Sequence, residues 1–176
     1  MILSINPIGY VETEHSDEEV SSSWPDGVRG RIIVYPAYAE GLLGLKGFSH
    51  IIALAWLHKV SDNARKVLKV RFRRFVRAGI RLEELPEVGV FCSDSPHRPN
   101  PIAITILRLE KIEHNVLHVS GLDLYNGTPI LDLRAYTPTY SITSYELPAW
   151  YEKLLQRLKS LGERSNERRG GLSTLE

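Results

Sequence analysis

Three prolines within six residues restrict residues 95–102 (SPHRPNPI) more strongly than any other segment of this chain. Each proline fixes its own φ angle and lacks a backbone donor, so the segment is neither the interior of a helix nor a central strand. The residue before a proline is pushed into extended geometry, which holds Asn100 in stiff backbone. The resulting loop presents His97, Arg98 and Asn100. It is either a tight surface turn or a functional site.

The length of 176 residues suffices for one domain with its own core, which we place at residues 1–140, with a C-terminal helix and irregular tail at residues 141–176. A net charge of +1 gives no general affinity for polyanions, so nucleic-acid binding would need a local basic patch. Cys92 is the only cysteine and no zinc-type spacing occurs, so we expect neither an internal disulfide nor a metal. No signal-length or membrane-spanning apolar run is present. We therefore expect a cytoplasmic protein without a membrane partner.

Short runs rich in β-branched and aromatic residues predict seven strands separated by turns. We place these strands at residues 8–12, 30–34, 50–57, 88–93, 102–112, 116–120 and 129–135. Closely spaced strands with few helices predict a mainly β fold, a closed or nearly closed antiparallel barrel.

Two turns connect the later strands. The pair Asn126-Gly127 is the strongest hairpin signal and precedes a strand that starts at Pro129. The pair His114-Asn115 predicts a second hairpin, with Asn115 in the positive-φ conformation. The strand at residues 102–112 begins with a run that is apolar except for Thr105, which predicts burial of both its faces at that end.

Two helical segments are expected. Residues 38–43 form a short turn that ends at Gly44. A longer helix begins near Pro148, where a proline is well tolerated, and ends at Gly162. Its apolar stripe consists of Trp150, Leu154, Leu155, Leu158 and Leu161. Residues 163–176 are polar and are predicted to lack regular structure.

Basic residues crowd residues 65–81, where Phe72 and Phe75 are interleaved with them. Phosphate neutralisation together with aromatic stacking surfaces is what a single-stranded or loop nucleic acid requires. This interpretation makes Arg71, Arg73 and Arg74 candidate contacts to RNA. The alternative is a flexible loop whose phenylalanines are buried in a core.

Four motifs occur in the order and spacing of a known family. They are residues 38–50 (YAEGLLGLKGFSH) with His58 after them, residues 88–102 (VGVFCSDSPHRPNPI), residues 122–132 (LDLYNGTPILD) and residues 136–138 (YTP). Together they resemble the TrmO-type tRNA methyltransferase family over most of residues 8–138.

The resemblance implies a single-sheeted β-barrel that binds S-adenosylmethionine without a Rossmann fold. It also implies a homodimer with the cofactor near the subunit interface. The expected reaction transfers a methyl group to the N6 nitrogen of threonylcarbamoyladenosine beside the anticodon of tRNA.

The family motifs imply roles for particular residues. The cofactor contacts that they imply are His58, Lys59, Ile104, Leu122, Asp123, Leu124 and Tyr125. Asp123 would accept from the ribose or the methionine amine, or it caps the following turn. Arg98 and Asn100 would hold a carboxylate or phosphate of the substrate, because a guanidinium grips such groups bidentately.

The residue that takes the acceptor's proton is left open among His97, Asp132 and Tyr136. Of the other histidines, His50 at a strand start is expected to be a hydrogen-bonded structural residue. His114 and His118 are expected to be exposed and receive no role.

The chain also departs from the family pattern. Asp94 stands where the family has an arginine, residues 77–86 replace a basic segment, and residues 23–27 are shorter and more acidic. The larger C-terminal domain of some members is absent. A divergent acceptor, or a paralogue that binds S-adenosylmethionine or RNA without turnover, is therefore the alternative to tRNA methylation. An enzyme for a small-molecule acceptor is a third possibility, against which the basic segment argues.

Overall fold

The computed structural model describes the backbone of residues 4–170 and the side chains of residues 4–161. Its contacts divide the chain into two compact units. Unit 1 comprises Met1–Lys66 and Pro96–Ser141, and unit 2 comprises Val67–Ser95 and Ile142–Glu176. Among the helices described, none combines the length and apolarity needed to span a membrane.

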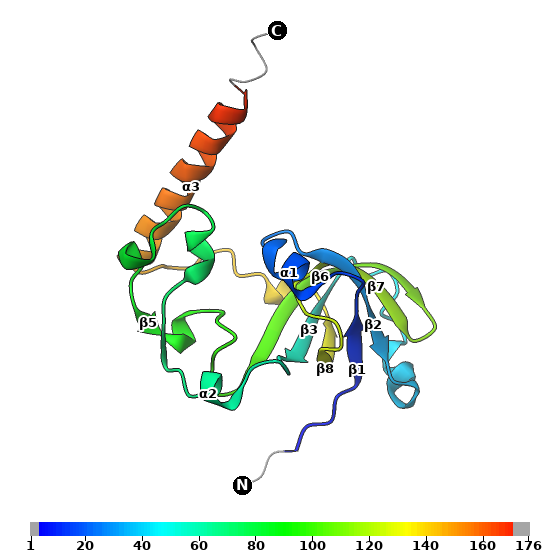
Figure 1. Ribbon diagram of the computed structural model, residues 1–176. Coiled ribbons are helices and arrows are strands. Elements are labelled where there is room, and N and C mark those ends of the chain that lie inside the picture. Colours follow the sequence, from blue (N-terminus) through cyan, green and yellow to red (C-terminus); the bar gives the residue numbers. More distant parts are fainter. Residues whose placement is uncertain (1–3, 171–176) are drawn as a thin grey trace. The chain divides into compact units, whose positions relative to one another are not determined.

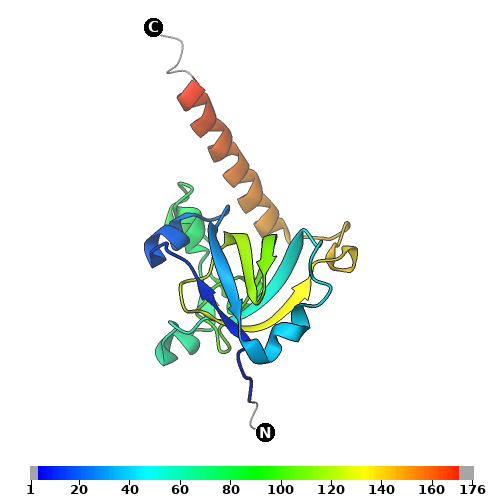
Figure 2. The ribbon, with the colours of Figure 1, turned by 90° about the vertical axis from the view of Figure 1, so that its right-hand side faces the viewer.

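Unit 1 is a closed antiparallel barrel, which confirms the predicted mainly β fold (Figure 1). Its strands, in chain order, are β1 (Gly9–Glu12), β2 (Val28–Val34), β3 (His50–Trp56), β6 (Ile102–Glu113), β7 (Val116–Leu122) and β8 (Pro129–Ala135). Around the barrel they follow the order β1-β2-β7-β6-β3-β8, and β8 closes it by pairing with β1. Figure 2 shows these strands, from blue β1 to yellow β8, curving around a common interior.

The barrel closes because alternate residues of each strand are apolar and point inward. In β3 the inward residues are Ile51, Ala53 and Ala55, all fully buried. The partner strands supply Leu107 and Leu117 to the same cluster. The small alanines of β3 leave room for these larger side chains, as the close packing of protein interiors requires.

The hairpin between β6 and β7 is confirmed, although its positive-φ residue is His114 (φ 54°) and not Asn115. Asn115 is held instead by a hydrogen bond from its Nδ2 to the Val34 carbonyl at 2.6 Å. His118 is half-buried rather than exposed, with Nε2 2.7 Å from a carboxylate oxygen of Glu113.

The predicted double burial of the start of β6 is wrong. Ile104 and Ile106 are 73% and 54% exposed, whereas the alternate residues Thr105 and Leu107 are buried. From Ala103 onward the strand alternates, because only one face of a barrel strand meets the interior. Unit 1 therefore carries two large apolar side chains on the outer face of β6.

Short helices connect the strands of unit 1. The structure contains α1 (Asp17–Ser22), η1 (Pro36–Leu42), α2 (Asp62–Arg65) and η5 (Pro138–Tyr140). The element η1 corresponds to the turn predicted before Gly44, whose φ is +81°. The helix α1 was not predicted. A capping box starts it, in which Ser16 Oγ accepts from Glu19 N at 3.3 Å and Ser16 N donates to the Glu19 carboxylate at 2.7 Å.

Unit 2 contains little regular structure besides its long helix. Two short strands, β4 (Lys69–Val70) and β5 (Val88–Gly89), pair with one another. Three 3₁₀ turns, η2 (Arg73–Val76), η3 (Leu82–Glu84) and η4 (Val90–Cys92), surround them, and α3 spans Ala149–Gly170. The strand predicted at residues 88–93 is thus only two residues long, because the chain turns into η4 at Val90.

The core of unit 2 consists of Phe72, Phe75, Ile80, Leu85 and Leu154. Phe72 and Phe75 stack on one another with their ring centroids 5.5 Å apart, and both are buried. They are therefore core residues with almost no exposed surface on which a base could stack. For the two phenylalanines, the interpretation as stacking surfaces for RNA is therefore wrong, and the interpretation as buried core residues is confirmed.

The helix α3 continues past the predicted stop at Gly162 to Gly170, so residues 163–170 of the expected irregular tail are helical. One glycine inside a helix costs only about 1 kcal/mol, and it did not outweigh the helix-forming residues that follow. Of the predicted stripe, Leu154, Leu158 and Leu161 pack in the core, whereas Trp150 and Leu155 are exposed. Residues 171–176 of the predicted tail lie outside the described residues.

Candidate functional site

The barrel topology brings the predicted site segments of unit 1 to one end. The strand β6 begins where β3 ends, because Trp56 pairs with Ile102, and Leu57 N donates to Pro101 O at 2.8 Å. The strand β7 runs antiparallel to β6, so it also ends at this end. The Pro-rich loop, the turn after β3 and the segment after β7 therefore share this end, which we call the loop end of the barrel.

A charged and aromatic cluster lies at the loop end. Lys59 Nζ is 2.5 Å from Asp17 Oδ2 of α1. The same Nζ lies over the ring of Tyr125, 5.1 Å from its centroid. Lys59 and Tyr125 were both predicted as cofactor contacts, and the structure brings them together. Asp17 was missed because it belongs to none of the sequence motifs; the Ser16/Glu19 capping pattern was the available signal for the helix that carries it.

The other predicted cofactor residues differ in which of their atoms a ligand could reach. Leu122 and Leu124 point into the barrel core and are buried, so only their backbone can meet a ligand. Asp123 between them is exposed and already takes part in an interaction within the protein. His58 is exposed in the turn after β3.

The outer faces of β8, β3 and β6 carry a further part of the predicted site. Leu54 of β3 pairs with Asp132 of β8 on one side and with Ile104 of β6 on the other. These three residues form one row across adjacent strands, which lie about 4.8 Å apart. Arg134, Ile52 and Ile106 form the next row in the same way. A candidate catalytic residue and a candidate cofactor residue thus share this face, which we call the outer face.

Asp132 is tied to its neighbours on the outer face. Its Oδ1 accepts from Leu133 N at 2.9 Å and its Oδ2 accepts from Arg134 Nε at 3.2 Å. A hydrogen bond to the Tyr140 side chain, together with the charge of Asp132, raises the pKa of Arg134 above its ordinary value. Arg134 therefore stays cationic and fixes the orientation of the Asp132 carboxylate.

Tyr136 follows β8 and continues the outer face towards the other end of the barrel. Its backbone N donates to His50 O at 3.0 Å, and the two rings lie 6.4 Å apart between centroids. His50 Nδ1 is 2.9 Å from Ser49 Oγ, which confirms the expected hydrogen-bonded histidine. The ring of Tyr136 also contacts Tyr140, at 6.2 Å between centroids.

The Pro-rich loop is held in shape by its own backbone. Arg98 N donates to Pro96 O at 3.0 Å, and Ile102 N donates to Asn100 O at 2.8 Å. His97 and Asn100 are exposed and Arg98 is half-buried. The loop therefore has a rigid backbone from which polar side chains project, because three prolines restrict its conformation.

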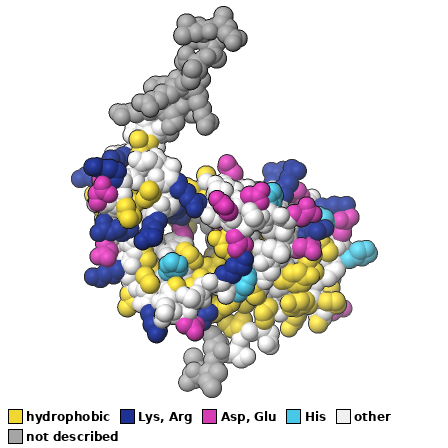
Figure 3. Space-filling view, viewed as in Figure 1, with side chains coloured by type: hydrophobic (Ala, Val, Ile, Leu, Met, Phe, Trp, Pro, Cys, Tyr) yellow, Lys and Arg dark blue, Asp and Glu magenta, His cyan; other side chains and the backbone are white. Residues whose placement is uncertain are grey.

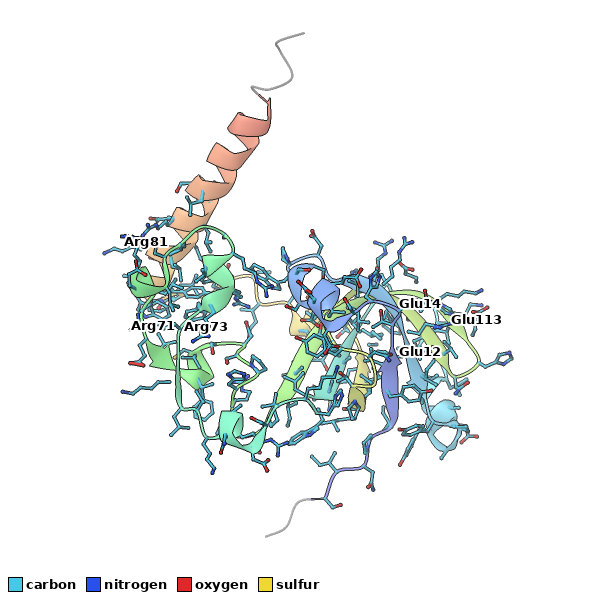
Figure 4. The ribbon with its side chains drawn as sticks, viewed as in Figure 1. Glu12, Glu14, Arg71, Arg73, Arg81 and Glu113 are labelled. Atoms are coloured by element: carbon cyan, nitrogen blue, oxygen red, sulfur yellow. The ribbon has the colours of Figure 1, made fainter. Side chains whose placement is uncertain are left out.

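The three arginines predicted to contact RNA belong to unit 2 and differ in their surroundings. Arg71 Nη1 donates to the carbonyls of Leu85 at 2.8 Å and Leu82 at 3.4 Å, so this side chain stabilises the η3 segment. Arg74 Nη2 lies 3.1 Å from Asp94 Oδ2. Arg73 is exposed. Figure 4 shows Arg71 and Arg73 beside the segment around β5.

Within the part of the chain whose side chains are described, no group of three or more His, Cys, Asp or Glu side chains could hold a metal ion. The candidate site is therefore built from a rigid polar loop, a Lys–Asp–Tyr cluster and a mixed apolar and polar sheet face. These features define a small β-barrel protein whose candidate site lies at the loop end and on the outer face.

Comparison with known proteins identifies the family. Residues 13–141 match the family described as the tRNA-methyltransferase O N-terminal domain, and the chain belongs to this family. A relative from Archaeoglobus fulgidus, named an S-adenosyl-L-methionine-binding protein, is 33% identical over 76% of this chain and 89% of its own. A human relative, named a tRNA (adenine(37)-N6)-methyltransferase, is 34% identical over 78% of this chain. The solved structure of TrmO from Pseudomonas aeruginosa is 27% identical and superimposes with a TM-score of 0.58 over 83% of this chain.

The relatives differ in length. The chain spans 31% of the human protein and 61% of the Pseudomonas chain. The matched region nevertheless contains the whole loop end, the outer face and the Pro-rich loop. The predicted family and its β-barrel fold are therefore confirmed.

Proposed function

We propose that this protein is an S-adenosylmethionine-dependent methyltransferase that modifies the N6 nitrogen of adenosine 37 in tRNA. The observation that carries the proposal is the family match over residues 13–141, which includes every unit 1 residue predicted for the site. The name of the human relative supports the acceptor atom. We further propose threonylcarbamoyladenosine as the acceptor nucleoside.

The residues of the loop end fit S-adenosylmethionine. The ring of Tyr125 already carries a cation on its face, since Lys59 Nζ lies 5.1 Å from its centroid. An aromatic face of this kind attracts a sulfonium as it attracts an ammonium. Asp123 and His58 supply exposed polar groups, and Ile104 supplies apolar surface. The cofactor brings an electrophilic methyl group, and these residues would bind and orient it.

The acceptor nitrogen must lose a proton, and Asp132 is the candidate that we favour as its acceptor. Asp132 shares a row of the outer face with Ile104, and Arg134 fixes its carboxylate. His97 and Tyr136 remain the other candidates. Arg98 and Asn100 would hold the threonyl carboxylate or a phosphate of the substrate, since the stiff loop fixes the backbone from which both side chains project.

A homodimer is part of the proposal, and the outer face supports it. Ile104 and Ile106 are exposed there beside Leu54, and a second copy would cover them. Large exposed apolar patches mark interaction sites on soluble proteins. We also propose that the protein works in the cytoplasm, where its substrate tRNA is found.

A second candidate function is binding without turnover. Asp94 replaces a basic residue of the family pattern, and the archaeal relative is named only as an S-adenosyl-L-methionine-binding protein. In that case the cofactor would bind and no methylated nucleoside would form.

Calorimetric titration with S-adenosylmethionine tests the cofactor site. We expect saturable binding by the wild type, clear weakening in Asp123→Ala, and no change in the control Glu87→Ala, which removes an exposed carboxylate from unit 2. Mass spectrometry of nucleosides from incubated tRNA then tests turnover, with Asp132→Asn expected to lose methylation and keep cofactor binding. Binding without methylation by the wild type would select the second function. No binding by the wild type would contradict both.

A further inference from the structure

Unit 2 contains a pocket that none of the predicted site residues except Arg74 touches. Its volume is about 470 Å³, within the range of small-molecule sites. Aromatic side chains dominate its lining, namely Phe72, Phe91, Trp150 and Tyr151. Arg74 and Asp94 add a charged pair to the same lining.

Two of the aromatic side chains that line the pocket are exposed, so a ligand could contact them. Phe91 is 79% exposed although it is a large apolar residue, and Trp150 is 36% exposed. Trp150 is kept in place by its neighbours, with ring centroids 5.3 Å from Tyr151 and 6.0 Å from Phe72. The buried Phe72 thus forms a floor that supports an exposed aromatic surface.

The charge around this pocket favours a polyanion. Residues 69–81 contain six Lys or Arg and no Asp or Glu, and of these Arg81 pairs with Glu83 and Glu84 just beyond the segment. Figure 3 shows Lys and Arg side chains spread over the visible surface of unit 2. The pocket acid Asp94 is neutralised by Arg74 at 3.1 Å. Phosphates of RNA would therefore meet cations around an aromatic pocket.

We propose that this pocket binds an unstacked nucleobase of the tRNA substrate, in addition to the base that is methylated. Phe91 and Trp150 provide the stacking surfaces, and the exposed arginine Arg73 contacts the backbone. Bases splayed out of RNA loops stack on aromatic side chains in this way. The Arg74–Asp94 pair offers both donors and an acceptor to the edge of the base. This inference rests on the proposed function, because it requires an RNA substrate.

The pocket also bears on the prediction that the basic segment combines phosphate-binding cations with aromatic stacking surfaces. Basic residues and aromatics do occur together in unit 2, but the aromatics that are exposed to a ligand come from η4 and the start of α3. They are distant in sequence from Phe72 and Phe75, so the pattern of residues 65–81 did not reveal them.

Fluorescence anisotropy with a labelled anticodon stem–loop RNA tests the proposal. Because Phe91 is so exposed, Phe91→Ala leaves the core intact. Its dissociation constant for the RNA should rise about fivefold to 150-fold, the effect of losing one base–aromatic stack. Phe91→Trp should restore binding. Leu68→Ala, which truncates another exposed apolar residue of unit 2 outside the pocket lining, should bind as the wild type does.

Tryptophan fluorescence gives a second readout that a structural role would not move. Bound RNA should quench the wild type, and Trp150→Phe should lose that quenching while Trp24 and Trp56 remain. Wild-type RNA affinity in Phe91→Ala, with cofactor binding and methylation intact, would overturn the nucleobase site and leave the proposed function standing. A wild type that binds neither tRNA nor the stem–loop would overturn both.

Discussion

Replacing Ile104 by alanine is the sharpest test of the outer face as a subunit interface. Full burial of an isoleucine side chain is worth about 1.5–3 kcal/mol. Ile104 is 73% exposed in the single chain, so covering the part that alanine lacks recovers about 1–1.5 kcal/mol in each subunit. A symmetric dimer contains the residue twice. The substitution should therefore weaken dimerisation by about 2–3 kcal/mol, a rise in the dissociation constant of about 30-fold to 150-fold.

Sedimentation equilibrium over a dilution series measures this change directly. The chain offers a matched control, because Ile142 of unit 2 is the same residue type and is 74% exposed. Ile142→Ala should leave the dissociation constant unchanged, and both variants should melt close to the wild-type temperature. An Ile104→Ala protein that dimerises like the wild type, or an equal loss in both variants, would refute the assignment of the interface to the outer face.

Two further predictions concern stability. Leu107→Ala removes a fully buried residue of the barrel core and should lower the free energy of unfolding in urea by about 2–5 kcal/mol, whereas Leu43→Ala, at a highly exposed position, should change it by less than about 0.5 kcal/mol. In unit 2, hydrogen bonds from Arg81 and then Arg157 lower the pKa of Glu84 from 4.5 to about 2. Since the folded pKa is depressed, the stability from this network is full above pH 4.5 and is lost as the pH falls through 2. Carboxyl NMR titration should find the pKa of Glu84 raised more by Arg81→Ala than by Arg157→Ala, and an unchanged value in both would contradict the network.

The barrel was predictable because its signals are local. The strand β8 was placed at its observed bounds, since Asn126-Gly127 and Pro129 fix where it begins. The strand β6 was also placed at its observed first residue, but the burial of its first residues was predicted wrongly, because a largely apolar run looks the same whether one or both faces are buried. Ile104 and Ile106 are exposed in the single chain.

The structure of unit 2 was harder to foresee because it depends on contacts between distant segments. Phe72 and Phe75 are buried in a core that includes Leu154 of α3, against which Tyr151 of the same helix also packs. The sequence of residues 65–81 alone does not indicate that α3 packs against this segment. The same packing leaves Trp150 exposed, although its spacing placed it on the apolar stripe.

Part of the candidate site followed from topology and part did not. The motif residues Lys59 and Tyr125 meet because β3 and β7 end at the same end of the barrel, and the barrel prediction implied this. Asp17 of α1 contacts Lys59 as well, and the only sequence signal for this helix was the capping-box spacing of Ser16 and Glu19. Arg134 was missed because its role is to hold its neighbour Asp132, which no motif states.

The reversed charge at Asp94 changes the chemistry of unit 2 less than the sequence suggests. Arg74 lies 3.1 Å from the Asp94 carboxylate, so the two together are neutral. Elsewhere in residues 69–81, Arg81 is likewise paired, with Glu84 at 2.9 Å. Arg71 donates to backbone carbonyls and Arg74 pairs with Asp94, which leaves Arg73 as the exposed arginine of these three that we assign to a phosphate. A neutral pair can donate to and accept from a base edge, whereas a lone arginine can only donate. If unit 2 binds RNA as we propose, the departure from the family favours altered base recognition over loss of RNA binding, because Arg73 stays exposed while the group beside the aromatic pocket has changed.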